Sequence, residues 1–127
     1  MKATELRIGN YIRHEDKNGA FTVEVIGITP KGATVKYGPG VSTITQEEIT
    51  PVPLTKQTLL RCGFSEVGIY ENVLHRGDYR VYLDAEAKDG LLKYETDDYH
   101  LEVEVKSVHQ LQNLYFALTG SELPVAL

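Results

Sequence analysis

The chain has 127 residues, of which 42% are apolar and 24% are charged, and its net charge is −5 at neutral pH. This length suits one compact domain or two small lobes, and the near-average composition gives no indication of disorder. The negative balance argues against a non-specific nucleic-acid binder, because phosphate neutralisation needs clustered lysine and arginine.

The cysteine count and the hydropathy pattern bear on the compartment. Cys62 is the only cysteine, so no disulfide can form within the chain, and a reducing compartment fits. No window approaches the roughly 20 apolar residues of a membrane span. The first residues also lack the apolar stretch of a signal peptide. We therefore expect a cytoplasmic protein without a membrane partner.

Residues 10–49 indicate four short strands separated by turns. The expected strands are Asn10–His14, Phe21–Ile28, Ala33–Tyr37 and Val41–Thr45. The Asn18-Gly19 pair favours a hairpin, because both residues tolerate positive φ. Strands spaced about ten residues apart predict a small curled sheet, here an SH3-like barrel.

A boundary between two lobes is predicted near Pro51 and Pro53, whose rings force an extended segment. We expect a lobe at 1–50 and a second at 51–127, with one shared core as the alternative. Thr55 has the character of a helix N-cap, and Gly63 can end the short helix in a left-handed conformation. This helix is expected to contribute its apolar side chains to the core, namely Leu59, Leu60 and Cys62.

The pattern from Phe64 to Lys106 returns to strands. The expected strands are Ile69–His75, Tyr79–Asp84, Leu91–Glu95 and Tyr99–Lys106. The last of these alternates most clearly, with Leu101, Val103 and Val105 on the core side and charged residues on the other. An antiparallel meander is the simplest arrangement.

The segment Ser107–Thr119 predicts a C-terminal helix that covers the meander, and Gly120 ends it. Ser107 and Gln110 fit a capping box, in which each side chain bonds the other residue's backbone N–H. One apolar stripe faces the core and consists of Val108, Leu111, Leu114, Tyr115 and Leu118. The predicted fold class is therefore α+β.

Phe116 projects off this stripe, on the flank of the helix that also carries His109 and Gln112. Either this flank packs against the N-terminal lobe or it meets another chain. The chain also holds eight tyrosines, and Tyr82 lies on the predicted meander. Because tyrosine is favoured at recognition surfaces, the candidate interaction surface combines His109, Gln112, Phe116 and Tyr82.

The densest group of potential metal ligands consists of Asp97, Asp98, His100, Glu102 and Glu104. These carboxylates are hard oxygen ligands, but the residues that share a face are strung along one strand. A turn followed by a solvated strand face explains them better than a metal site does.

Cys62 has no histidine tied to it by a local signature, and a cysteine at the end of an amphipathic helix is usually a small buried side chain. The four histidines show no zinc-binding spacing. We therefore expect a protein that is not an enzyme and has no cofactor and no metal.

Two stretches carry a resemblance, namely Glu5-Leu6-Arg7-Ile8-Gly9-Asn10-Tyr11 and His109-Gln110-Leu111-Gln112-Asn113-Leu114-Tyr115-Phe116-Ala117-Leu118-Thr119-Gly120. With the central segments Pro53-Leu54-Thr55 and Leu60–Phe64, they make the chain similar to a family of small uncharacterised bacterial and prophage proteins. The family has no established activity. The resemblance implies a cytoplasmic accessory protein tied to mobile DNA.

We therefore expect a non-catalytic interaction module that binds a protein partner or itself. The first alternative is a nucleic-acid-associated accessory factor of a mobile element, which a basic stripe of Arg13, Lys31 and Lys36 would favour. The second is a small metal-dependent hydrolase. It needs a pocket where ligand-type residues converge, and the candidates are His75, Asp98, His100 and Glu102.

Overall fold

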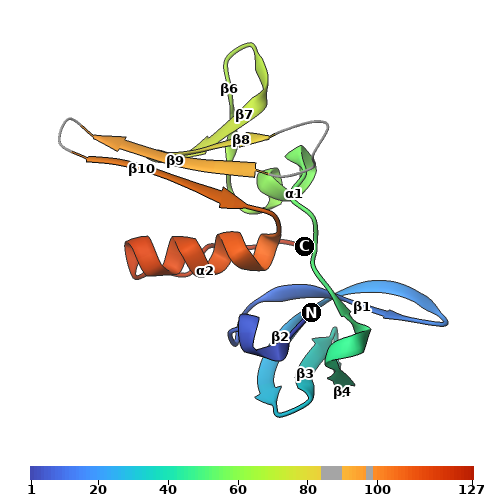
Figure 1. Ribbon diagram of the computed structural model, residues 1–127. Coiled ribbons are helices and arrows are strands. Elements are labelled where there is room, and N and C mark those ends of the chain that lie inside the picture. Colours follow the sequence, from blue (N-terminus) through green and yellow to red (C-terminus); the bar gives the residue numbers. More distant parts are fainter. Residues whose placement is uncertain (84–89, 97–98) are drawn as a thin grey trace. The chain divides into compact units, whose positions relative to one another are not determined.

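The computed structural model describes residues 1–83, 90–96 and 99–127, which form two compact units, Met1–Val52 and Pro53–Leu127 (Figure 1). The described chain is mostly β and has two antiparallel sheets of five strands each together with two α-helices, so it belongs to the α+β class as predicted. Neither of these helices has the length and apolar character needed to cross a membrane. The predicted division into lobes at 1–50 and 51–127, with one shared core as the alternative, stays a prediction.

The first unit is an open antiparallel sheet with the strand order β4-β3-β2-β1-β5. Its strands are β1 (Tyr11–Asp16), β2 (Gly19–Thr29), β3 (Gly32–Tyr37), β4 (Gly40–Thr45) and β5 (Ile49–Thr50). The four predicted strands are present. Short 3₁₀ turns, η1 (Ala3–Glu5) and η2 (Gln46–Glu48), precede β1 and β5.

The predicted closure of this sheet into an SH3-like barrel is not observed in the described residues. Closure needs the two edge strands to pair, and the edge strands β4 and β5 do not pair with each other. β5 has only two residues and contacts β1 through Arg13 and His14.

One face of the first sheet forms the core of its unit. The buried residues are Leu6, Ile12, Val23, Val25, Ala33, Val35, Ile44 and Ile49. Phe21 shares the parity of Val23 and Val25 but is exposed, because it lies near the hairpin end opposite His14. The predicted hairpin is present: Asp16 pairs with Gly19, and Lys17-Asn18 form the two-residue turn between them.

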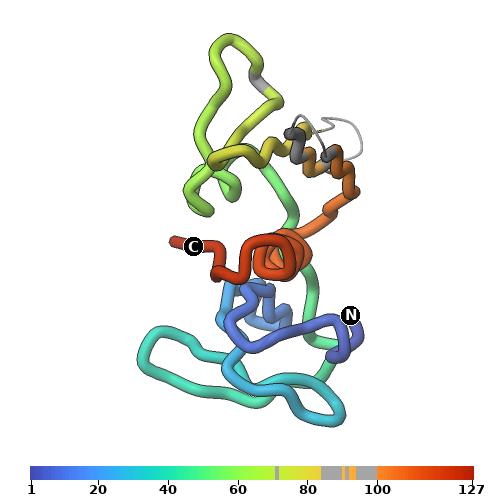
Figure 2. The backbone as a smooth tube through the Cα atoms, turned by 90° about the vertical axis from the view of Figure 1, so that its left-hand side faces the viewer, coloured from blue at the N-terminus to red at the C-terminus, as the bar shows by residue number. Residues whose placement is uncertain are grey.

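The second unit holds an antiparallel meander with the order β10-β9-β8-β7-β6. Its strands are β6 (Ser65–Val67), β7 (Tyr70–Arg76), β8 (Tyr79–Leu83), β9 (Gly90–Thr96) and β10 (Tyr99–Val105). The predicted alternation of β10 is confirmed, since Val105 is buried while Glu102 and Glu104 are exposed. The turn between β6 and β7 projects away from the helix that covers the sheet (Figures 1 and 2).

The short helix α1 (Lys56–Arg61) begins as predicted, because the Thr55 hydroxyl accepts a hydrogen bond from the Thr58 N–H at 3.1 Å. Gly63 follows the helix with a positive φ of 81°. Leu59 and Cys62 are fully buried, but Leu60 is 45% exposed. The prediction of Leu60 as a core residue is wrong, because one residue along a helix turns the side chain by about 100°.

Helix α2 (Val108–Thr119) runs along one face of the second sheet (Figure 1). The residues buried in this unit include Leu54, Leu59, Cys62, Phe64, Leu74, Val81, Leu92, Val105, Val108 and Leu111. The face of the sheet opposite α2 is not covered by any element of the Pro53–Leu127 unit in the described residues. The second sheet therefore has an inner face packed on the helix and a polar outer face.

Candidate functional site

Helix α2 begins and ends where the sequence predicted, with its N-cap at Ser107 and its C-terminal end at Gly120. The Ser107 hydroxyl accepts a hydrogen bond from the Gln110 N–H at 3.4 Å, and Gly120 ends the helix with φ 73°. The predicted capping box is wrong in one detail. The Gln110 side-chain oxygen accepts from the Lys106 N–H at 2.8 Å instead of from Ser107.

The predicted apolar stripe of α2 is buried only in its first half. Val108 and Leu111 are fully buried, whereas Leu114 and Tyr115 are half-buried and Leu118 is 36% exposed. The placement of Leu118 in the core is therefore wrong, because it lies in the last turn before Gly120, where the helix ends. Burial concentrates where α2 begins, directly after β10.

The predicted flank of α2 divides into two environments. His109 and Gln112 are 3% and 2% exposed, and His109 Nδ1 lies 3.0 Å from the Ser107 hydroxyl oxygen. Phe116 is 39% exposed. Of these three residues, only Phe116 is open to another molecule in this structure.

Tyr82, the fourth residue of the predicted surface, lies on the outer face of the second sheet. Its neighbour Val81 is fully buried on the inner face, and side chains alternate along a strand. Tyr82 is therefore on the side of the sheet away from α2, and the structure does not bring it together with Phe116. Its ring lies 4.8 Å from the Lys93 ammonium nitrogen.

The candidate metal ligands do not converge in the described residues. His100 Nε2 lies 3.4 Å from a Glu102 carboxylate oxygen, but His75 is on β7, three strands from β10. Asp97 and Asp98 lie outside the described residues. Within the ranges that the structure describes, no three His, Cys, Asp or Glu side chains are grouped to hold a metal ion.

Cys62 is fully buried, and burial raises the pKa of its thiol to about 11, with the Arg76 guanidinium acting in the opposite direction. At neutral pH the thiol is therefore protonated, which is the wrong state for a nucleophile.

The basic residues considered for nucleic-acid binding do not form a continuous stripe. Arg13 and Lys36 lie on the outer face of the first sheet, since Ile12 and Val35 beside them are buried. The strand between them places Glu24 directly opposite Lys36. Glu24 also contributes, after burial, to the raised pKa of Tyr11, so its charge acts on this face.

A groove runs between the edge strand β10 and helix α2. It has a volume of about 440 Å³ and is lined by Val103, Glu104, Val105, Lys106, Gln110, Asn113 and Leu114. The strand supplies apolar side chains from its inner face and charged side chains from its outer face. The helix supplies residues 110, 113 and 114, which are neighbours on one helical surface. The groove therefore offers both an apolar floor and a polar rim.

The backbone of β10 is open on the groove side. β10 is the last strand in the order of its sheet and pairs only with β9 in the described residues. The Lys106 N–H points away from β9, because it donates to Gln110 on α2. In an antiparallel strand, alternate residues direct their N–H and C=O groups to the same side. The N–H and C=O groups of Glu102 and Glu104 thus also point to the open edge.

Comparisons of this chain with protein-family models, with curated proteins and with solved structures find no match. The resemblance carried by the two terminal motifs stays a prediction.

The groove was not among the sites predicted from the sequence. The alternation of residues 99–106 identified a strand, and Ser107 identified the start of a helix directly after it. The edge position of β10 depends on the order of strands in the sheet, which this local pattern does not contain.

Proposed function

We propose that this protein is a non-catalytic interaction module that binds an extended segment of a partner protein in the groove between β10 and α2. The observation that carries this proposal is the row of backbone groups at Glu102 and Glu104 beside the groove, which pair with no other strand in the described part of the chain. A peptide that adds a strand to such an edge gains main-chain hydrogen bonds, while side-chain pockets supply specificity.

The charges of the groove indicate the chemistry of the partner. The Pro53–Leu127 unit holds 7 of the 13 Lys and Arg residues and 12 of the 18 Asp and Glu residues, so it carries the whole net charge of −5. Glu102 and Glu104 are exposed on the edge strand, and opposite charges on neighbouring strands attract. The partner segment therefore alternates basic residues facing these glutamates with apolar residues facing the helix side.

A second copy of the chain fits this edge less well than a basic segment does. Antiparallel pairing of β10 with another β10 centred on Val103 places Glu102 opposite Glu104, and pairing centred on Glu104 places that residue opposite itself. Like charges directly opposite each other are destabilising. We therefore favour binding of a partner over self-association.

The proposal can be tested with a capped peptide of alternating lysine and valine, titrated into the ¹⁵N-labelled protein. We expect saturable changes in the amide signals of Glu102 and Glu104, together with slower hydrogen exchange at both N–H groups. Saturable changes elsewhere, with these two amides unaffected, would contradict the proposal.

Sedimentation velocity of the free protein checks for self-association. If the protein forms a dimer and the Glu104→Pro variant is a monomer, the edge of β10 binds a second copy of the chain.

Two variants separate the backbone contribution from the charge. Glu104→Pro removes an N–H that faces the open edge and leaves the pairing of β10 with β9 intact, because proline is tolerated at such positions. Glu104→Gln keeps that N–H and removes only the charge. We expect the proline variant to abolish peptide binding and the glutamine variant to weaken it. Equal affinity of both variants and the natural protein would exclude strand addition at this edge.

We also propose that the first unit is related to SH3-like folds. Its strand order is β4-β3-β2-β1-β5, and a 3₁₀ turn precedes the short β5. We also propose a cytoplasmic location, which the single cysteine supports.

The alternative of a nucleic-acid accessory factor gains no support from the basic residues of the first sheet, since the negative charge of Glu24 lies on the same face, directly opposite Lys36.

A further inference from the structure

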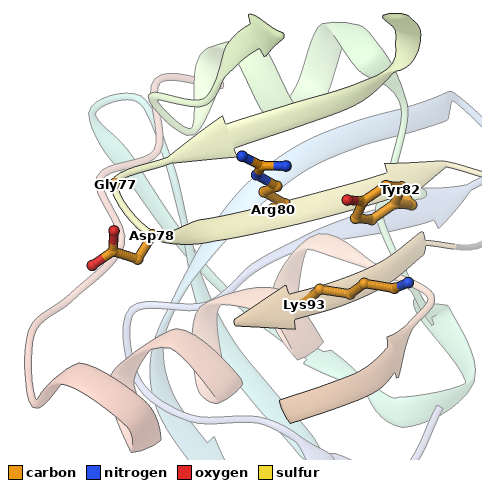
Figure 3. Close-up of a pocket in the computed structure, with 5 residues that line it drawn as sticks. All are labelled: Gly77, Asp78, Arg80, Tyr82 and Lys93. Carbon is orange, nitrogen blue, oxygen red and sulfur yellow. The ribbon is translucent and has the colours of Figure 1, made fainter. Parts of the chain in front are cut away.

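The outer face of the second sheet carries a polar pocket of about 220 Å³, separate from the groove beside β10. It is lined by Gly77, Asp78, Arg80, Tyr82 and Lys93. Figure 3 shows the Arg80, Tyr82 and Lys93 side chains on the same side of strands β8 and β9, while Asp78 lies at the end of the hairpin. The pocket therefore gathers two cations on a sheet surface.

Arg80 and Lys93 are cross-strand neighbours, and their charged ends reach different parts of the pocket: the Arg80 guanidinium points toward β7 and the Lys93 ammonium toward Tyr82 (Figure 3). The register of β8 and β9 pairs Arg80 with Lys93, and cross-strand neighbours have Cβ atoms about 5 Å apart. The lining of the pocket therefore offers cationic donors from two neighbouring strands to a ligand with negative charge.

Among the described residues, no carboxylate pairs with Arg80. Its side chain is exposed and makes no hydrogen bond or ion pair within the described part of the chain. Guanidinium groups bind planar or tetrahedral oxyanions through two parallel hydrogen bonds. Arg80 is therefore free to make such a pair with a ligand.

Lys93 is held beside the pocket without being fully paired. Its ammonium nitrogen lies over the Tyr82 ring, 4.8 Å from the centroid, and 3.8 Å from a Glu102 oxygen. The Glu102 separation is too long for a hydrogen bond, so donors of the ammonium group remain available. The contact with Tyr82 fixes the position of the charge.

From this geometry we infer that the Arg80–Lys93 pocket binds the dianionic phosphate group of a phosphate monoester. The two cations that line the pocket match two negative charges, and Arg80 supplies the bidentate contact. Asp78 at the hairpin end of the pocket repels a second anionic group, so the ligand carries one phosphate and not a polyphosphate chain. The pocket shares no lining residue with the groove beside β10, and Glu102, 3.8 Å from Lys93, lies between the two sites.

The test uses inorganic phosphate as the probe, with acetate as a singly charged control, at constant ionic strength and with ¹⁵N-labelled protein. We expect phosphate to shift the amide signals of Arg80 and Lys93 saturably, with at least about tenfold tighter binding than acetate. Absence of saturation at tens of millimolar phosphate, or equal binding of acetate, would overturn the inference.

Two variants locate the site. Arg80→Gln is expected to weaken phosphate binding at least about tenfold, whereas Arg61→Gln, which changes an exposed arginine outside the pocket, leaves it unchanged. Equal weakening in both variants would show non-specific attraction and contradict the site.

A capped phosphoserine peptide then distinguishes the two possible sources of the phosphate group. Tighter binding than inorganic phosphate indicates a phosphate on a partner protein, and equal binding indicates a small phosphate ester.

Discussion

The Nε–H group of Arg76 donates a hydrogen bond to the hydroxyl oxygen of Tyr115, and the two atoms are 3.3 Å apart. The Tyr115 ring also meets the Tyr79 ring edge-on, with centroids 5.7 Å apart. These contacts attach α2 to β7 and β8 through a different flank of the helix from the one that lines the groove beside β10. They add to the buried Val108 and Leu111 side chains in holding α2 on the sheet.

The hydroxyl and the ring of Tyr115 can be tested separately. Tyr115→Phe removes only the hydrogen bond with Arg76 and should lower the free energy of unfolding by about 1 kcal/mol. Tyr115→Ala also removes the ring contact with Tyr79 and should cost about 2–4 kcal/mol, since the side chain is half-buried. Urea denaturation measures both. A Tyr115→Ala variant that is as stable as the natural protein would show that Tyr115 does not hold the helix on the sheet.

The gradient of burial along α2 leads to a second prediction. Leu111 is fully buried and Leu118 is 36% exposed, although both belong to the apolar stripe. Leu111→Ala should lower the free energy of unfolding by about 2–5 kcal/mol, because it leaves a cavity. Leu118→Ala is the matched control and should cost less than about 1 kcal/mol. Similar losses in the two variants, measured by thermal or urea unfolding, would contradict the observed packing.

The elements that sequence patterns predicted are those with enough residues to show a period. β10 has seven residues, and its alternation correctly separated Glu102 and Glu104 from the core side chain Val105. β5 has two residues and β6 has three, which is too short for any period to be recognised. Helical spacing identified Leu111 correctly, but it could not show that the covering of α2 decreases toward Gly120.

Neither candidate site could be predicted from local patterns. The phosphate pocket depends on Arg80 lying opposite Lys93, and a register shift of one residue between β8 and β9 would move Lys93 to the inner face. The groove depends on β10 being an edge strand. Both properties arise from pairing between strands. The predicted surface of His109, Gln112, Phe116 and Tyr82 was assembled from residue types, and its members occupy different environments.

Gly32 at the start of β3 has no room for a side chain. A Cβ atom at this position would overlap the Ile44 carbonyl oxygen and the Thr45 backbone of the neighbouring strand β4. Because backbone atoms cannot move aside as a flexible side chain can, Gly32→Ala should destabilise the protein by at least about 2 kcal/mol.

Gly27 on the adjacent strand β2 is the control, since a Cβ there would make only ordinary contact with the Thr34 side chain at 3.5 Å. Gly27→Ala should therefore leave stability nearly unchanged or raise it slightly. Circular dichroism of thermal unfolding compares the two variants. A Gly32→Ala protein as stable as the Gly27→Ala protein would show that β3 and β4 do not approach as closely as observed.

Burial of Cys62, which raises the pKa of its thiol to about 11, has consequences for reactivity and for pH dependence. A thiol-specific disulfide reagent at mildly alkaline pH should react with Cys62 slowly in the folded protein and rapidly after addition of urea.

The raised pKa of Cys62 also makes the stability of the protein depend on pH in a defined direction. Below the ordinary thiol pKa of about 9 both states keep the proton, so pH has no effect through Cys62. Between about 9 and 11 the unfolded chain releases the proton while the folded chain retains it, and stability falls as pH rises.

Cys62→Ala isolates this contribution from the tyrosines, which titrate in the same range. The variant should unfold at lower urea concentration, because it loses buried volume, yet its stability should decrease less steeply with pH above about 9 than that of the natural protein. Urea unfolding across the alkaline range gives both slopes. Identical slopes, or rapid thiol reaction without urea, would mean that Cys62 is accessible to solvent in the folded state and that its thiolate is not suppressed by burial.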